Sequence, residues 1–140
     1  MFKDLFGMAD QVAAVTGAAS GLGLAMAEAH LAAKFNRPGA TLVDHYTYVL
    51  MGDGCNQEGV SSEAASLAGH LGLGKLVYVY DDNHISIDGP TELSLSDNAV
   101  RRFESYGWHV LDIGEQGEDL DALESALRTA MAVTDRPSLV

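Results

Sequence analysis

The chain has little positive charge. Of its 140 residues, eight are Lys or Arg and twenty are Asp or Glu, which gives a formal net charge of −12. Such a chain is poorly suited to nucleic acid or to an anionic membrane surface, so we expect neither as a partner. It also has few basic side chains with which to bind phosphate. A phosphate ligand would depend on helix N-termini, backbone N–H groups or a bridging cation.

Cysteine and long apolar runs are also scarce. Cys55 is the only cysteine, so the chain can form no internal disulfide bond, which favours a reducing compartment. No apolar run approaches the length of about 20 residues that spans a bilayer. The N-terminus has no basic region and carries Asp4 and Asp10, which argues against a secretory signal. We therefore expect a cytoplasmic protein without membrane contact.

The composition and length are those of one globular domain. Apolar residues make up 47% of the chain and charged residues 20%, which is ordinary for a soluble protein and excludes a disordered one. A chain of this length can bury a core of its own. We therefore expect residues 1–140 to form a single domain.

Short apolar segments alternate with helical patterns along the whole chain. The patterns predict strands over 11–17, 41–51, 75–83, 108–113 and 136–140, and helices over 21–35, 61–74, 96–107 and 118–133. Ser61 or Ser62 is the expected N-cap of the second helix, Gly72 or Gly74 its end, and Asp97 the expected N-cap of the third. This alternation predicts a doubly wound, Rossmann-like α/β fold, with about five parallel strands and helices on both faces.

Two polar segments follow predicted strands, "GDGCNQEG" after the second and "DDNHISIDG" at the end of the third. Taken alone, Gly52-Asp53-Gly54 is typical of a turn that needs backbone freedom. Asn83, however, lies thirty positions after Asp53, and if the two strands are neighbours both residues emerge at one edge of the sheet. A carboxylate and a carboxamide oxygen suit Mg²⁺ or Ca²⁺. Such a cation would bridge a diphosphate to this acidic chain.

The same segments resemble the transketolase family, in the domain that binds the diphosphate of thiamine diphosphate. The resemblance rests on "GDGCNQEG", "YDDNHISIDG", "RFESYGWHV" and "AVTDRPSL" and runs from about Leu24 to Val140. It implies that Asp53 and Asn83 are Mg²⁺ ligands through their side chains and that Ile85 contributes its backbone carbonyl. Diphosphate oxygens and a water would complete the coordination.

The resemblance also implies contacts with the cofactor itself. Gly52 and Gly54 would bind the cofactor, Gly54 through a backbone N–H to the diphosphate. Glu58 would lie near the cofactor and the subunit interface, and His84 would form a wall of the site. Family members catalyse ketol transfer as dimers and carry a second domain that binds the aminopyrimidine and activates the cofactor. We therefore expect this chain alone to be catalytically incomplete, and to pair with a second copy or with a complementary pyrimidine-binding chain.

Residues 1–23 suggest a different relationship. The pattern Thr16-Gly17-x-x-x-Gly21-x-Gly23 resembles the opening β-α unit of short-chain dehydrogenases, and Asp44 lies near the spacing of a ribose-binding acid. An NAD(P)-binding module is thus an alternative, although no tyrosine has lysine four residues later, as that family requires. These glycines would otherwise only allow a helix to pack closely on a strand. A third alternative is a chimeric scaffold without activity, joining residues 1–23 to residues 24–140.

Overall fold

The computed structural model describes residues 13–140 of the chain. Its centre is a five-stranded sheet in the order β1-β2-β3-β7-β6, in which every neighbouring pair is parallel. The strands are β1 (Ala13–Thr16), β2 (Thr47–Gly52), β3 (Leu76–Asp81), β6 (His109–Val110) and β7 (Ser138–Leu139). The predicted parallel Rossmann-like sheet is confirmed.

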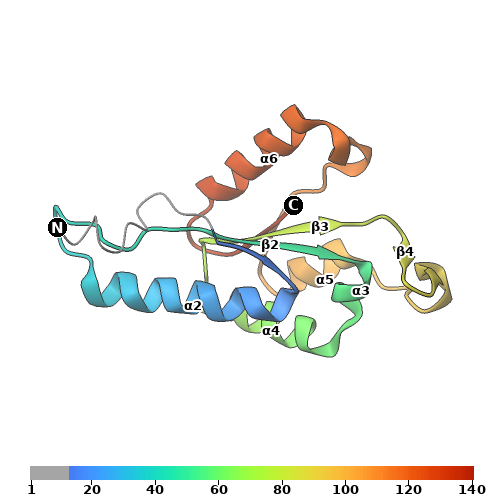
Figure 1. Cartoon of the computed structure of the whole chain (residues 1–140), viewed down its shortest axis with the longest axis horizontal. Coiled ribbons are helices and arrows are strands. Elements are labelled where there is room, and N and C mark those ends of the chain that lie inside the picture. The colour runs from blue at the N-terminus through green and yellow to red at the C-terminus, as the bar shows by residue number, and fades with distance from the viewer. Residues whose placement is uncertain (1–12) are drawn as a thin grey trace.

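Helices cover both faces of this sheet (Figure 1). One face is covered by α2, α4 and α5, and the other by α6, which packs on β3 and β7. The helices are α2 (Ala18–Phe35), α3 (Asp53–Gln57), α4 (Gly59–Leu71), α5 (Ala99–Ser105) and α6 (Leu120–Ala132). A small antiparallel pair, β4 (Ile85–Ser86) and β5 (Gly89–Pro90), projects beyond the carboxyl end of β3, and the 3-10 helices η1 (Thr91–Leu93) and η2 (Gly114–Glu118) complete the chain.

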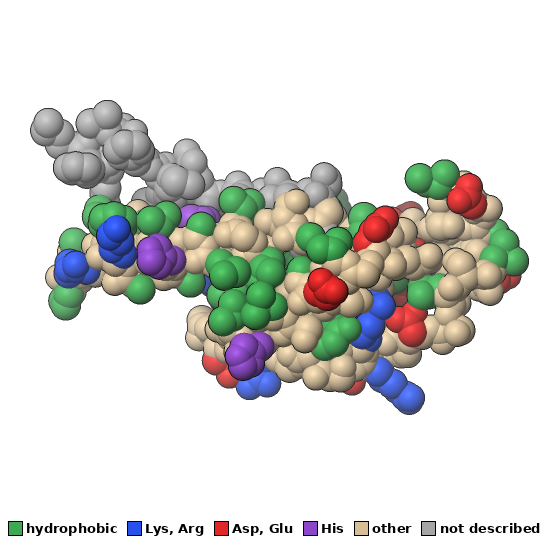
Figure 2. All heavy atoms as spheres, turned by 90° about the horizontal axis from the view of Figure 1, so that it is seen from below, with side chains coloured by type: hydrophobic (Ala, Val, Ile, Leu, Met, Phe, Trp, Pro, Cys, Tyr) green, Lys and Arg blue, Asp and Glu red, His purple; other side chains and the backbone are tan. Residues whose placement is uncertain are grey.

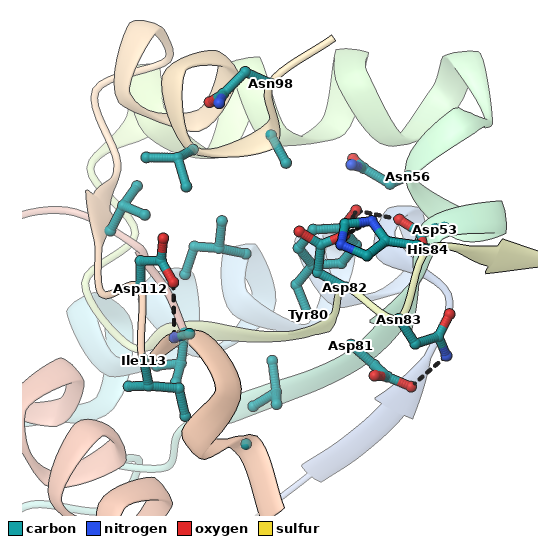
Figure 3. A pocket seen from close by; sticks show the side chains of 18 of the residues that line it. Asp53, Asn56, Tyr80, Asp81, Asp82, Asn83, His84, Asn98, Asp112 and Ile113 are labelled. Carbon is teal, nitrogen blue, oxygen red and sulfur yellow. Dashed lines mark hydrogen bonds and ion pairs between the residues drawn. The ribbon is translucent and has the colours of Figure 1, made fainter. Parts of the chain in front are cut away.

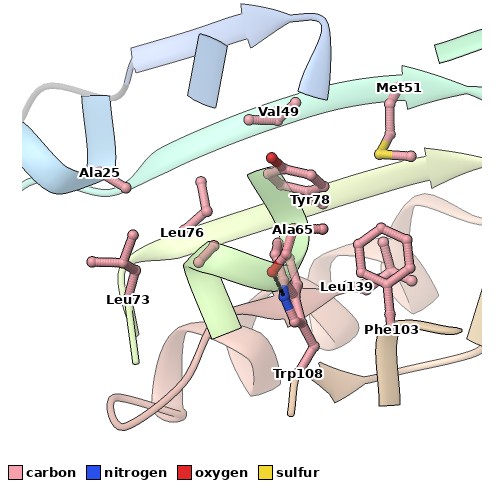
Figure 4. Close-up of a cluster of buried hydrophobic side chains, with 11 residues drawn as sticks. Ala25, Val49, Met51, Ala65, Leu73, Leu76, Tyr78, Phe103, Trp108 and Leu139 are labelled. Carbon is pink, nitrogen blue, oxygen red and sulfur yellow. Dashed lines mark hydrogen bonds between the residues drawn. The ribbon is translucent and has the colours of Figure 1, made fainter. Parts of the chain in front are cut away.

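The larger core lies between the sheet and the helices α2, α4 and α5 (Figure 4). Trp108 and Phe103 both meet Tyr78 edge-on, with ring centroids 4.6 Å and 6.2 Å from the Tyr78 ring. The Trp108 indole donates a hydrogen bond of 2.8 Å to the carbonyl of Ala65 on α4. Burial raises the pKa of Tyr78 to about 12. These aromatic contacts join α4 and α5 to the central strand β3.

The smaller core lies under α6. Val77 and Val140 from the sheet pack there against Ala126 and Ala130 of the helix. Tyr46 donates a hydrogen bond of 2.8 Å to the carbonyl of Met131 and so ties the segment before β2 to the end of α6. Because α6 is the one helix packed on this face in the described chain, part of it is open, and Leu50 of β2 is 53% exposed.

Some predicted helix ends are confirmed and others are wrong. Gly72 ends α4 with a left-handed backbone, φ +63°, as expected. Ser61 does not cap this helix, because α4 begins at Gly59 and the Ser61 hydroxyl donates instead to the carbonyl of Cys55 at 2.6 Å. The N-cap of α5 is Asn98 rather than Asp97, whose carboxylate pairs with Arg102 at 2.8 Å.

Replacement of Asn98 by Ala is expected to lower the free energy of unfolding by about 1 kcal/mol. The Asn98 side-chain oxygen accepts the N–H of Arg101 at 2.8 Å, one of the N–H groups that α5 cannot satisfy internally. Urea denaturation followed by circular dichroism measures the loss. Asn98→Asp keeps the acceptor and should stay within a few tenths of a kcal/mol of the wild type; an equal loss in both variants would exclude capping as the cause.

Candidate functional site

A cavity of about 850 Å³ lies at the carboxyl edge of the sheet, beside β3 and β7. The strand order changes direction there, because the chain passes from β3 to the outer strand β6 and then returns to β7. Acidic and amide side chains contribute much of the lining, among them Asp53, Asn56, Asp81, Asp82, Asn83, Asp97, Asn98 and Asp112. The cavity therefore lies where the sequence places its two polar segments, and it favours cations.

Asp53 enters this cavity from the end of β2. It is the first residue of α3, and the ladder pairs Gly52 with Asp81 of β3, so the two strands end side by side. The Tyr80 hydroxyl donates a hydrogen bond to Asp53 Oδ1 (Figure 3). Asp53 is 2% exposed, and its Oδ2 finds no hydrogen-bond partner among residues 13–140. An unpaired buried carboxylate oxygen is costly unless a ligand, here a cation, satisfies it.

Tyr80 and Asn56 complete the polar end of the cavity, and both were missed in the sequence. Burial raises the pKa of the Tyr80 hydroxyl and its bond to Asp53 raises it further, while the nearby Asn56 amide lowers it, so the hydroxyl stays protonated and remains a donor. Asn56 is 3% exposed, and its Nδ2 reaches hydrogen-bond geometry with nothing in the described chain. Figure 3 shows it directed toward the same space as Tyr80. The sequence could have indicated Asn56 if helix α3 had been predicted, because residues 53 and 56 lie on the same face of such a helix.

Asn83 follows β3 as expected, but its side chain is not directed at Asp53. Its Nδ2 donates to Asp81 Oδ2 at 2.9 Å (Figure 3). Its Oδ1 accepts the N–H of Ile85 at 3.1 Å. Asparagine side chains commonly form such local turns when no other partner binds them. The structure therefore brings Asp53 and Asn83 to one cavity without bringing their oxygens together.

Of the other residues that the resemblance assigns to the cofactor, His84 is the one that lines the cavity in the described chain. His84, which lines the cavity, has the left-handed backbone that few non-glycine residues adopt, φ +60°. Gly54 is the second residue of α3, and a Cβ atom there would meet no atom within 4 Å. Gly52 ends β2, and Glu58 is an exposed residue between α3 and α4; both lie outside the lining given by the described residues.

None of the residues of the predicted dinucleotide turn belongs to the lining of this cavity. Thr16 ends β1, Gly17 has φ +94°, and Gly21 is required for packing, because a Cβ atom there would lie 2.2 Å from Val49 Cγ2. A Cβ atom on Gly23 would meet nothing within 4 Å. In a dinucleotide-binding fold, the acidic residue that binds the ribose would follow β2, at the carboxyl edge of the sheet.

Asp44 precedes β2 instead, because the strand begins at Thr47 and not at residue 41. Asp44 forms an ion pair with Lys75, which also binds Glu28 at 2.9 Å. It thus lies at the amino edge of the sheet, opposite the glycine turn at the carboxyl end of β1. The NAD(P) alternative has no support from this geometry.

The carboxylates of the described residues do not form a complete metal site by themselves. Among residues 13–140, no group of three or more His, Cys, Asp or Glu side chains is arranged to hold a metal ion. A cation here would need amide, carbonyl and ligand oxygens beside the carboxylate. No helix in this part of the chain is long and apolar enough to cross a bilayer.

Comparison with known proteins identifies the family. The model of the family "Transketolase, thiamine diphosphate binding domain" matches residues 14–140, so the match includes the glycine turn that resembled a dehydrogenase. Transketolase from Nostoc sp. is 62% identical over 124 residues, and chloroplastic transketolase-1 from Arabidopsis thaliana is 55% identical. These matches cover 89% of this chain and 18% and 17% of the two relatives.

Solved structures agree with this assignment. A crystal structure of Pichia stipitis transketolase in complex with sedoheptulose 7-phosphate matches with a TM-score of 0.84 at 48% identity, and covers 87% of this chain and 18% of that one. Transketolase from Leishmania mexicana matches with a TM-score of 0.83 at 51% identity, with 86% and 18% covered. The chain thus spans less than a fifth of these relatives. It belongs to the transketolase family and corresponds to part of the thiamine diphosphate-binding domain.

Proposed function

We propose that this chain binds the diphosphate of thiamine diphosphate through a divalent cation, Mg²⁺, with Asp53 as the central ligand. The observation that carries the proposal is the unpaired Asp53 Oδ2, on a side chain that is 2% exposed and lines the cavity at the end of β2. A bound cation would remove the cost of this buried charge. It would also let a chain with net charge −12 accept an anionic cofactor.

Asn83 and Ile85 are the other proposed ligands, through the carboxamide oxygen and the backbone carbonyl. The Asn83 side chain is 2.9 Å from Asp81 in the described state, so cation binding would exchange this contact for a ligand bond. Gly52 and Gly54 would bring backbone N–H groups to the diphosphate, and His84 and Glu58 would border the cofactor. When bound, thiamine diphosphate supplies the carbanion chemistry of ketol transfer, while these residues hold and orient its diphosphate.

Ketol transfer itself requires parts that lie outside this chain. We propose that a second copy, or a complementary pyrimidine-binding chain, completes the site in the cytoplasm; the Arabidopsis relative is chloroplastic. Figure 2 shows hydrophobic side chains gathered on the face that α2 and α4 form. Leu24, Met26, Leu67 and Leu71 are each between 40% and 44% exposed there. Such an apolar surface favours contact with another protein surface.

Titration calorimetry with thiamine diphosphate, with and without Mg²⁺, tests the proposed cofactor site. We expect binding that requires Mg²⁺ and is weak, with a Kd roughly in the range 10 µM to 1 mM, because no aminopyrimidine pocket contributes. NAD⁺ serves as the parallel ligand and should release no binding heat. Binding of thiamine diphosphate without metal, or no binding with it, would overturn the role of Asp53. A response to NAD⁺ would return the glycine turn at Gly17 to consideration.

A further inference from the structure

Asn56 is a buried hydrogen-bond donor at the wall of the cavity. It is 3% exposed, and Figure 3 shows its amide group directed toward the same space as Tyr80. Its Nδ2 reaches hydrogen-bond geometry with no described residue, although the amide is near enough to lower the pKa of the Tyr80 hydroxyl. A buried amide costs free energy unless a hydrogen-bond partner satisfies it. The unpaired Nδ2 therefore points to a ligand group that accepts a hydrogen bond.

The other donors around Asn56 already have partners. The Tyr80 hydroxyl donates to Asp53. The Asn83 amide donates to Asp81 at 2.9 Å. The lining contributed by the described residues contains no Lys or Arg side chain. Among these lining residues, Asn56 Nδ2 is therefore the buried donor that an entering anion finds without a partner.

Asn56 is also a neighbour of the proposed cation ligand. It follows Asp53 by three positions on α3, so the two side chains share one face of the helix, with Cβ atoms about 5–6 Å apart. Asp53 Oδ2 has no partner among the described residues either. An unpaired acceptor and an unpaired donor side by side suit two charges of opposite sign, a cation on the carboxylate and its anion on the amide.

The backbone that carries Asn56 is held by two other helices. Arg102 of α5 donates from Nη2 to the Asn56 carbonyl at 3.3 Å. The hydroxyl of Ser61 on α4 donates to the carbonyl of Cys55 at 2.6 Å. These contacts keep the donor at the cavity wall before a ligand binds, which lowers the cost of ordering it on binding.

We propose that Asn56 is a binding residue for the cofactor diphosphate, and that its Nδ2 donates a hydrogen bond to a phosphate oxygen beside the cation on Asp53. This inference rests on the proposed cation site. A hydrogen bond to a charged oxygen is stronger than one between neutral groups, so the acidic chain gains an attractive contact with the anion. The same amide lowers the stability of the ligand-free chain, because it is buried without a partner.

The test is Asn56→Leu, which keeps a branched side chain and removes both polar atoms. Calorimetry at saturating Mg²⁺ measures the affinity for thiamine diphosphate and for inorganic pyrophosphate. We expect both dissociation constants to rise by roughly 10-fold, the loss of one hydrogen bond to a charged group. The metal-free melting temperature should rise by about 2–4 °C, because the unpaired buried donor is gone.

Asn56→Asp decides which atom of the amide meets the ligand. It keeps the shape and places a second carboxylate beside Asp53, so we expect weaker binding than in Asn56→Leu, because this charge repels phosphate. Tighter binding than in the wild type would mean that the Asn56 oxygen binds the cation, and would overturn the donor role. Asn98→Asp is the matched control: it adds the same charge to an exposed residue of the same lining and should change the affinity by less than about 3-fold.

The affinity and the melting temperature together separate binding from a structural role. An unchanged affinity in Asn56→Leu, or a loss of affinity together with a lower melting temperature, would make Asn56 a structural residue only. If the wild type binds neither probe in the presence of Mg²⁺, the proposed cofactor site fails and this inference fails with it. The wild-type titration shows that failure separately from any result on the variants.

Discussion

Replacement of Asp53 by Asn is expected to weaken Mg²⁺-dependent binding of thiamine diphosphate by at least about 100-fold. The substitution keeps the size and shape of the side chain and removes its charge. The Asp53 oxygen without a partner belongs to a residue that is 2% exposed, so the substitution removes a buried, poorly screened charge from the proposed cation site. Calorimetry in saturating Mg²⁺ measures the loss directly.

Asp112→Asn provides the matched control for this experiment. Asp112 lines the same cavity but is exposed, and its carboxylate accepts the N–H of Gly114 at 2.9 Å, after β6 (Figure 3). The control changes the net charge by the same amount and should alter the affinity by less than about 3-fold, because an exposed charge is screened. Equal losses in the two variants would mean that overall charge, and not a cation on Asp53, governs binding. The metal-free melting temperature of Asp53→Asn should be no lower than that of the wild type, because the substitution removes the charge from a buried, unpaired group.

Gly69→Ala is expected to lower the free energy of unfolding by about 3 kcal/mol or more. A Cβ atom on Gly69 would lie 1.9 Å from the Tyr106 carbonyl oxygen and 3.2 Å from Trp108 Cδ1. The first contact is with backbone at the end of α5, so rotation of a side chain cannot relieve it. Helix α4 would have to move away from α5, and the hydrogen bond from Trp108 to Ala65 would be disturbed.

The loss is measurable by urea unfolding followed by the fluorescence of Trp108, the only tryptophan in the chain and 4% exposed. Gly59→Ala is the control, because it lies on the same helix and its added Cβ would meet no atom within 4 Å. Because alanine favours a helix more than glycine does, Gly59→Ala should raise the free energy of unfolding by up to about 1 kcal/mol relative to the wild type. If the free energy of unfolding of Gly69→Ala is within about 1 kcal/mol of that of the wild type, α4 and α5 can move apart at little energetic cost.

The alternation of five strands with four helices along the chain could be predicted because each of these elements is a local pattern of apolar residues. The order of the strands within the sheet could not. The limits of β2 could not, because residues 41–46 have the composition of a strand while pairing with β3 begins only at Thr47. The N-cap of α5 is ambiguous in the sequence for a similar reason, because Asp97 and Asn98 are both good N-cap residues. In the structure the Asp97 carboxylate forms an ion pair with Arg102, and Asn98 caps the helix.

The site was predictable in position but not in detail. Asp53 and Asn83 could be placed at one edge because both follow strands. In the sequence Tyr80 is indistinguishable from the other apolar residues of β3. Its hydroxyl becomes important only because the β2–β3 pairing places it beside Asp53, to which it donates a hydrogen bond. The turn that directs Asn83 toward Asp81 and Ile85 depends on side-chain rotation, which residue spacing does not encode.

The pairing of Gly52 with Asp81 has a consequence for recognising distant relatives of this site. Between these partners the chain passes through α3, α4, a return loop and β3 itself, so the thirty positions from Asp53 to Asn83 measure the length of that path. Residues added to the return loop would change the interval and leave the meeting point intact. One residue inserted within β3 would turn Tyr80 to the α6 face and dismantle the site at an almost unchanged interval. Patterns based on ladder partners would therefore detect relatives that a fixed interval misses.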